Sequence, residues 1–244
     1  MAKVPGKRLS KDEVASLNAT FEKAPPQEIL RWALSTFGRQ IALSWSGAED
    51  VALLDMMHRI DPASTRVFVL DTGRLNPETY ELIDEVQSKY KVPIEIQFPD
   101  AAAVRKMVEE KGINLFYRSL ANRKECCAVR KVEPLKIALS KLDGWITGQR
   151  RSQAVTRGKL AKVELDFQHD KIVKVNPLAD WSTSQVFDYL KANGVPTNKL
   201  HAMGYPSIGC APCTRAVKPG EDERAGRWWW ENPDSKECGL HPAP

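Results

Sequence analysis

Short apolar segments alternate with longer amphipathic ones between residues 40 and 147, and no other feature of the sequence constrains the fold as strongly. The short segments carry the β-branched and aromatic residues of buried strands and cover residues 40–45, 65–70, 94–98 and 144–147. Helical periodicity marks residues 48–60, 77–89, 101–110 and 124–139. Strands that alternate with helices pair in parallel and carry helices on both faces. The sequence therefore predicts an α/β fold: a single-domain, open, doubly wound and mostly parallel sheet.

The flanking segments complete the predicted organisation. Ser10 to Glu13 has the form of a capping box that opens a first helix, and Pro25-Pro26 separates it from a second helix over 27–37. Residues 160–165 and 171–175 indicate a hairpin, and residues 182–192 a helix. We expect N-terminal helices packed on the core (1–39), the α/β core (40–199) and an irregular cysteine-rich segment (200–244). The tryptophans Trp228–Trp230 favour a metal-ordered segment over a disordered one.

Composition excludes some classes of protein. The chain has 42% hydrophobic and 27% charged residues, as ordinary globular chains do. Its formal net charge of +5 is compatible with an anionic ligand or with nucleic acid and does not choose between them. No apolar run is long enough to span a bilayer, and the basic N-terminus lacks the apolar stretch of a secretion signal. We expect a cytoplasmic protein with no membrane partner.

The five cysteines divide into two close pairs and one single residue. The pairs are Cys126 with Cys127 and Cys210 with Cys213, and Cys238 stands alone. An odd number of cysteines in a reducing compartment argues against a disulfide framework. Four thiolates suit either a tetrahedral zinc or an iron–sulfur cluster, although adjacent cysteines are an awkward pair for one small ion. Cys238, flanked by charged residues and glycine, is a candidate nucleophile, since a thiolate with cationic neighbours attacks readily.

Three loops follow predicted strands at the edge where open α/β sheets bind ligands. They cover Ser44 to Asp50, Leu70 to Arg74, and Gly148 to Gln153. Small residues in the first loop let backbone N–H groups approach an anion at a helix N-terminus. Glycine and arginine in the third loop suit an anionic ligand as well. Ordinary strand-to-helix turns and a solvated basic loop are the alternatives.

Together these motifs resemble the PAPS/APS reductase family of sulfonucleotide reductases, in its cluster-containing assimilatory branch. SxSGxxD at Ser44 is followed by LDTG at Leu70, CCxxRKxxPL at Cys126, GxRxxQ at Gly148, CxxC at Cys210 and ECGLH around Cys238. All of them occur in the family's order. The first two loops are also similar to those of the related ATP pyrophosphatases, which implies a fold like that of the adenine nucleotide alpha hydrolases.

The resemblance implies a set of roles. Cys126, Cys127, Cys210 and Cys213 would hold a [4Fe-4S] cluster, and Cys238 would be the catalytic nucleophile. Substrate-binding residues would be Ser44, Ser46, Gly47, Leu70, Asp71, Thr72, Gly73, Lys131, Gly148, Arg150, Arg224, Arg227 and His241. The implied reaction is the reduction of adenosine 5′-phosphosulfate (APS) to sulfite and AMP through a Cys238 S-sulfocysteine, with thioredoxin as the reductant. No nucleic-acid partner is expected, and a homo-oligomer stays open.

Three alternatives compete with that interpretation. The 3′-phosphorylated substrate PAPS is disfavoured because Glu49 puts an acid in the first loop, where it repels a further phosphate. A cluster-containing ATP pyrophosphatase that thiolates tRNA would share the nucleotide loops but would not need the ECGLH motif. A non-catalytic nucleotide-binding or metal-binding regulator would tolerate replacement of Cys238.

Overall fold

A computed structural model of the chain describes residues 7–153 and 157–232. Within these residues a six-stranded sheet has the strand order β3-β2-β1-β4-β6-β5. The strands are β1 Ile41–Trp45, β2 Val67–Leu70, β3 Ile94–Gln97, β4 Gly144–Ile146, β5 Val163–Asp166 and β6 Ile172–Val175. Every neighbouring pair is parallel except β5–β6, which forms the expected antiparallel hairpin. The predicted open, mostly parallel sheet is confirmed.

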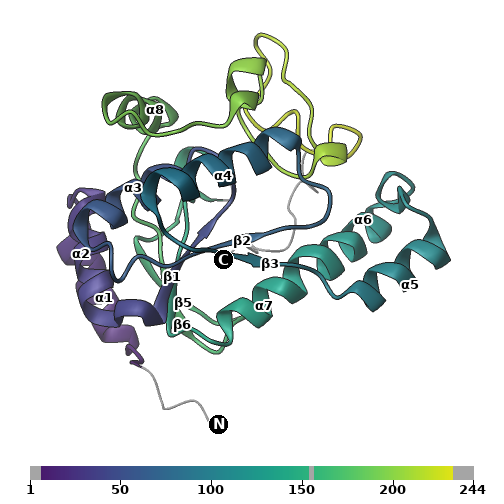
Figure 1. Cartoon of the computed structure of the whole chain (residues 1–244). Coiled ribbons are helices and arrows are strands. Elements are labelled where there is room, and N and C mark those ends of the chain that lie inside the picture. The colour runs from purple at the N-terminus through teal and green to yellow at the C-terminus, as the bar shows by residue number, and fades with distance from the viewer. Residues whose placement is uncertain (1–6, 154–156, 233–244) are drawn as a thin grey trace.

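Helices cover both faces of the sheet, as a doubly wound fold requires (Figure 1). One face packs against α1 Lys11–Phe21, α2 Pro26–Phe37, α3 Val51–Ile60, α4 Pro77–Tyr90 and α8 Thr183–Ala192. The other face packs against α7 Glu133–Leu139, whose leucines contact Phe68 and Trp145. Two further helices, α5 Ala101–Lys111 and α6 Leu120–Cys127, precede α7 in the chain. Both cores consist of aliphatic and aromatic residues with little or no exposed surface, so burial of apolar area stabilises the layered arrangement.

The N-terminal helices begin and attach as their sequence indicates. Ser10 and Glu13 form the predicted capping box at the start of α1. From α1 the side chain of Asn18 accepts a hydrogen bond from the Val163 backbone N–H (3.0 Å) and donates one to the Val163 carbonyl (2.8 Å). Because Val163 lies on the edge strand β5, this contact occupies backbone groups that would otherwise be open to another strand.

Two predicted helices differ from the structure. The helix expected from residue 48 begins at Val51, because Asp50 folds back and accepts hydrogen bonds from Ser46, which keeps residues 47–50 in a turn. The helix expected over 124–139 starts earlier, at Leu120 after the Ser119 N-cap. It is also interrupted by a π-helical segment, Ala128–Val132, directly after the cysteine pair. Such segments break the regular helical register and are frequent at functional sites.

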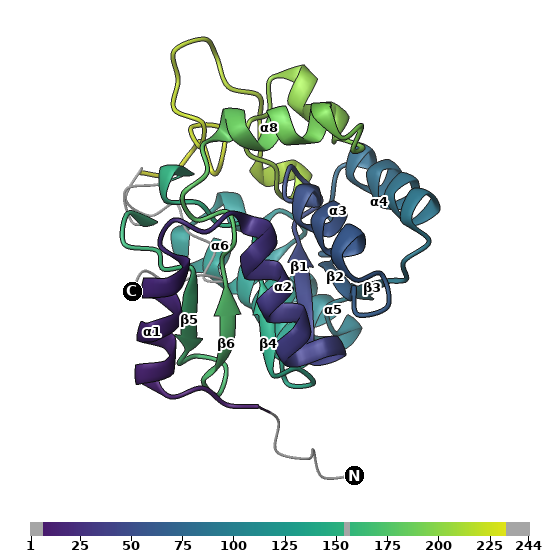
Figure 2. The ribbon, with the colours of Figure 1, turned by 90° about the vertical axis from the view of Figure 1, so that its left-hand side faces the viewer.

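The segment that follows α8 crosses the carboxyl ends of the parallel strands (Figure 2). It is largely irregular, with short 3-10 helices at Lys199–Met203 and Ala211–Cys213 and a β-bridge between Thr214 and Arg227. Across the described part of the chain, no helix has the length and apolar character needed to cross a membrane. The segment therefore forms one wall of any site built at this edge of the sheet.

Candidate active site

A pocket of about 200 Å³ lies at the carboxyl ends of β1, β2 and β4, beneath the C-terminal segment. The strand order reverses between β1 and β4, and this is the position where open α/β sheets bind ligands. Most of the residues predicted to bind substrate line this pocket: Ser44, Ser46, Leu70, Thr72, Lys131, Gly148, Arg150, Arg224 and Arg227. The structure therefore brings together residues from four separate sequence motifs.

Three of the predicted substrate residues shape the loops without lining the pocket. Gly47 has a φ of +78°, and a β-carbon there would lie 2.6 Å from Thr79 Cγ2. Asp71 accepts hydrogen bonds through Oδ1 from the Gly73 N–H (2.7 Å) and the Tyr80 hydroxyl (2.9 Å). Gly73 has a φ of +69° and packs beside Arg130. Their positions fit a role in holding the loops in shape rather than in touching a ligand.

The first loop contains an ionisable group whose titration is strongly perturbed. Asp50 is buried and accepts hydrogen bonds from the Ser46 N–H (2.9 Å) and the Ser46 hydroxyl (2.8 Å). Burial, followed by the adjacent Glu49 carboxylate, raises the pKa of Asp50 to about 6, against the opposing effect of these hydrogen bonds. A carboxyl group with this pKa exchanges its proton near neutral pH at the base of the pocket.

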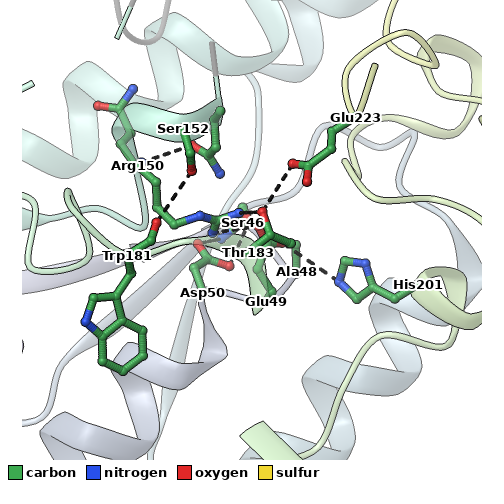
Figure 3. A network of polar contacts seen from close by, with 12 residues as sticks. Ser46, Ala48, Glu49, Asp50, Arg150, Ser152, Trp181, Thr183, His201 and Glu223 are labelled. Carbon is green, nitrogen blue, oxygen red and sulfur yellow. Dashed lines mark hydrogen bonds and ion pairs between the residues drawn. The ribbon is translucent and has the colours of Figure 1, made fainter. Parts of the chain in front are cut away.

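Arg150 lies at the centre of a network of polar contacts on the pocket wall (Figure 3). Its Nη1 lies 2.9 Å from Glu49 Oε1, and both side chains are almost fully buried. Its Nη2 donates to the Thr183 hydroxyl (3.4 Å), which in turn donates to Glu223 Oε2 (3.2 Å). On the opposite side of Glu49, His201 Nε2 lies 3.8 Å from Oε2. The network joins the first loop, the third loop, α8 and the C-terminal segment around one guanidinium group.

The second wall of the pocket is a stack of two guanidinium groups on one tryptophan. Arg227 lies 4.6 Å and Arg123 4.7 Å from the Trp228 ring centroid. Arg227 also donates from Nη1 to the Ile208 carbonyl (3.0 Å). Arg123 is fully buried and pairs with Glu231 through Nε (2.9 Å) and Nη2 (2.8 Å). The stack fixes the orientation of Arg227 at the pocket surface.

The four paired cysteines line a second, smaller cavity next to the pocket: Cys126, Cys127, Cys210 and Cys213. Lys131, Cys210 and Trp228 line both spaces and form the wall between them. All four are free thiols, and the Thr72 hydroxyl lies 3.2 Å from Cys210 Sγ. Residues more than 80 positions apart in the sequence therefore place four sulfur atoms around one space.

The surroundings of these thiols shift their pKa values in different directions. Burial, and then the neighbouring Cys127, raises the pKa of Cys126 to about 11. Burial and then Cys210 raise the pKa of Cys213 to about 12. Burial opposes ionisation of Cys210 as well, but Lys131, Thr72 and Arg227 together lower its pKa below the ordinary value. Four thiolates in this space therefore need additional positive charge, which is what a metal group supplies.

The four thiols are the candidate metal ligands of this cavity. Among the described residues, no group of three or more His, Cys, Asp or Glu side chains is placed to hold a single metal ion. The Trp228 indole N–H is buried beside the cavity and makes no hydrogen bond to the described part of the chain. Four sulfurs around one space are a donor set that suits a metal group, either a tetrahedral zinc or an iron–sulfur cluster.

Sequence reasoning missed several pocket residues. The sequence predicts only repulsion of a further phosphate for Glu49, whereas the structure pairs it with Arg150 on the pocket wall, with His201 beside it. Arg157 and Glu223 line the pocket as well, and their positions in basic or charged loops gave no specific signal. The predicted nucleophile Cys238 and the predicted substrate residue His241 lie outside the described residues.

Comparisons with known proteins agree with this arrangement. Residues 40–216 match the family model described as the phosphoadenosine phosphosulfate reductase domain. A Burkholderia cepacia protein named adenosine 5′-phosphosulfate reductase is 57% identical, over 72% of this chain and 70% of its own length. The Arabidopsis thaliana protein named 5′-adenylylsulfate reductase 3, chloroplastic, is 48% identical over 94% of this chain. The chain spans about half the length of that protein and of the other plant relatives that it matches.

A solved structure supports the same relationship. The phosphoadenylyl-sulfate (PAPS) reductase of Candida auris, in a phosphate complex, superposes with a TM-score of 0.74 at 29% identity. The superposition covers 87% of this chain and all of that one. The family model covers all six strands and the loops that follow β1, β2 and β4. The chain therefore belongs to the phosphoadenosine phosphosulfate reductase family.

Proposed function

We propose that this protein is a thioredoxin-dependent APS reductase, which converts adenosine 5′-phosphosulfate to sulfite and AMP for assimilatory sulfate reduction and cysteine biosynthesis. The observation that carries the proposal is the shared wall of Lys131, Cys210 and Trp228 between a cationic nucleotide pocket and a four-thiol cavity. Nucleotide-binding loops alone fit many reactions. A nucleotide pocket that adjoins four cysteines is compatible with few reactions.

The pocket supplies two kinds of contact for such a substrate. Loops after β1 and β2 present small side chains and backbone N–H groups to the adenosine end. Lys131, Arg150, Arg224 and Arg227 are the cationic groups for the phosphosulfate. The guanidinium Nε of Arg150 is buried and makes no hydrogen bond within the described chain, which leaves it as a donor for an anionic ligand. An anion is therefore the ligand class that this pocket fits best.

The proposed chemistry has two steps, and its nucleophile rests on the sequence motif around Cys238. The Cys238 thiolate attacks the substrate sulfur, a new S–S bond forms, the S–O bond to the phosphate breaks, and AMP leaves. A thiolate of reduced thioredoxin then attacks Cys238 Sγ and releases sulfite. Its second thiol resolves the mixed disulfide, so that the dithiol is oxidised and Cys238 is regenerated. His241, in the same motif, is proposed to assist substrate binding.

We assign a [4Fe-4S] cluster to the cavity of Cys126, Cys127, Cys210 and Cys213. Four thiols around one space and the adjacent Cys126–Cys127 pair, which is awkward for one small ion, support it. When bound, the cluster would supply local electrostatic charge beside the pocket. The residues that respond to that charge are Lys131, which faces Cys210, and Arg123, which contacts Cys127.

Two observations favour APS over PAPS as the substrate. The relatives with 57% and 48% identity are named for the substrate without the 3′-phosphate, whereas the 29% identical structure is named for PAPS. The pocket also contains two adjacent carboxyl groups of the first loop, Glu49 and Asp50. Pairing with Arg150 offsets part of the Glu49 charge, so its repulsion of a further phosphate is weaker than the sequence alone suggests.

We also propose how the parts of the chain act together and in which compartment the protein works. N-terminal helices 1–39, the core 40–199 and the segment 200–244 would act as one unit, since the pocket is lined by both the core and the last segment. A reducing, cytoplasmic compartment would keep the cluster thiols and Cys238 reduced.

Anaerobic turnover tests the proposal. Purified protein with reduced thioredoxin should release sulfite and AMP from APS with a higher kcat/KM than from PAPS, and Cys238→Ser should release none. A higher kcat/KM with PAPS would agree with the proposed two-step reaction but would contradict APS as the substrate. Cleavage of ATP to AMP and pyrophosphate, with no sulfite from either sulfonucleotide, would instead indicate the tRNA-modifying class. Binding of AMP without any turnover, unchanged in Cys238→Ser, would indicate a non-catalytic regulator.

A further inference from the structure

His201 has a buried nitrogen directed at the pocket network. It lies on the 3-10 helix Lys199–Met203 of the C-terminal segment, and its side chain is 9% exposed. It does not line the pocket, but it lies next to Glu49, which does (Figure 3). Its place in the fold therefore allows it to act on the pocket through Glu49, or through the Tyr205 turn that leads to Pro206.

The imidazole ring has a fixed orientation. Nδ1 lies 2.9 Å from the Tyr205 carbonyl, and since a carbonyl only accepts, Nδ1 carries the hydrogen of this bond. The ring also packs edge-on against Phe187 of α8, with the centroids 5.1 Å apart. These two contacts leave Nε2 directed at Glu49 Oε2, 3.8 Å away. Nε2 is buried and makes no hydrogen bond to any described residue.

Glu49 lies between the side chains of Arg150 and His201. Its Oε1 is 2.9 Å from Arg150 Nη1, and its Oε2 faces His201. Because Nδ1 is already bonded to Tyr205, only a doubly protonated ring presents an N–H donor to this carboxylate. A carboxylate held from both sides keeps one position, and the guanidinium that it pairs with keeps one position as well.

We propose that His201 is a positioning residue for the substrate: it holds Glu49, and Glu49 holds the Arg150 guanidinium at the pocket wall. The identity of the ligand rests on the proposed function, whereas the geometry of the three side chains does not. His201 touches neither the ligand nor the reacting atoms. Its effect is on the affinity for the anionic part of the ligand rather than on the chemical step.

Two substitutions separate this role from a merely structural one. In His201→Gln the amide nitrogen reaches the place of Nε2 and faces Glu49, but the contact with the Tyr205 carbonyl is lost. In His201→Asn the amide nitrogen reaches the place of Nδ1 and retains the Tyr205 contact, but nothing faces Glu49. We expect His201→Gln to bind AMP within about twofold of the wild type and His201→Asn to bind it about tenfold more weakly.

AMP affinity is measured by calorimetry under anaerobic conditions, with kcat and KM for APS beside it. The expected KM changes follow the AMP affinities, while kcat changes by less than about threefold in either variant. If His201→Asn retains its AMP affinity and His201→Gln loses it, the ring only shapes the Tyr205 turn, and the proposal is overturned. Equal affinities in both variants and the wild type would overturn it too.

A double-mutant cycle and a matched control complete the test. In a Glu49→Gln background, His201→Asn should add no further loss of AMP affinity, whereas additive losses would contradict the route through Glu49. His169 is the control, since its Nδ1 also pairs with a carboxylate, Asp166, at 2.7 Å, in the turn between β5 and β6. His169→Asn should leave AMP affinity unchanged. A wild type that binds AMP but turns over no APS would count against the proposed function and leave the His201 measurement intact.

Discussion

Gly148 packs so closely against Asp50 that a β-carbon at position 148 would lie 2.3 Å from Asp50 Cβ. The two residues belong to different loops, after β4 and after β1, and both line the pocket. Asp50 in turn accepts two hydrogen bonds from Ser46 and holds the first loop in its turn. The third loop therefore supports the first one directly, and the absence of a side chain at position 148 makes that support possible.

Gly148→Ala is expected to disturb both loops. The added methyl group forces Asp50 away from Ser46, which should lower the free energy of unfolding by about 1–3 kcal/mol and weaken AMP binding. Chemical denaturation and calorimetry measure the two effects. Gly194→Ala is the control, because nothing lies within 4 Å of its β-carbon position, although its φ is +57°. It should cost about 1 kcal/mol of backbone strain and leave AMP affinity unchanged.

Asp50 gives the protein a specific pH dependence of stability. Its folded pKa of about 6 lies above the unfolded value of 3.8, so the folded state binds the proton more tightly. The stability that this provides is complete below the unfolded pKa and is lost as pH rises through the folded pKa. Relative to Asp50→Asn, which does not titrate, the wild type should lose about 3 kcal/mol of unfolding free energy between about pH 4 and pH 7.

Urea denaturation of both proteins across that range measures the difference. Parallel stability curves for the wild type and Asp50→Asn would show that the folded carboxyl group titrates normally and would contradict the assigned effect of burial and of Glu49.

The buried ion pair between Arg123 and Glu231 should dominate the stability of the segment that carries Trp228. The side chains are 0% and 7% exposed, and Glu231→Gln removes the carboxylate that this buried guanidinium pairs with. We expect a loss of about 3 kcal/mol of unfolding free energy, measured by denaturation. The exposed pair Lys199–Glu81, at 70% and 56% exposure, is the matched control, and Glu81→Gln should cost less than about 1 kcal/mol. Equal losses in the two variants would show that burial of the first pair has no energetic effect.

The cysteine assignments predict which variants keep iron. Wild-type protein purified without oxygen should contain about four iron atoms per chain, and Cys126→Ser should contain fewer, because it lacks one thiolate ligand. Metal analysis and visible absorption check this, with Cys238→Ser as the control that keeps its iron. Zinc in place of iron in the wild type, or iron loss in Cys238→Ser equal to that in Cys126→Ser, would contradict the division of the cysteines.

Much of the fold followed from local signals in the sequence. The strand segments ending at Trp45 and Leu70 carry the apolar runs of buried strands, and the capping box at Ser10 fixes the start of α1. The loops that follow these strands meet at one edge because parallel strands end together, so the motif residues Ser46, Thr72 and Arg150 converge as expected.

The contacts between distant side chains were not predictable in this way. Glu49 and His201 come together only after the C-terminal segment crosses the sheet, and neither residue has a local pattern that specifies the other. The contacts of the Trp228 ring with Arg123 and Arg227 also have no local sequence pattern that specifies them. The π-helical segment at Ala128–Val132 was also missed, because the apolar periodicity on either side of it is that of one continuous helix.

Intact mass spectrometry shows directly whether Cys238 takes the sulfonate group from the substrate. Anaerobically purified protein is mixed with APS in the absence of thioredoxin, with Cys238→Ser in parallel. Only the wild type should gain the mass of one sulfonate group, and reduced thioredoxin should remove it. No adduct on iron-containing wild type with either APS or PAPS, or an equal adduct on Cys238→Ser, would contradict this role of Cys238.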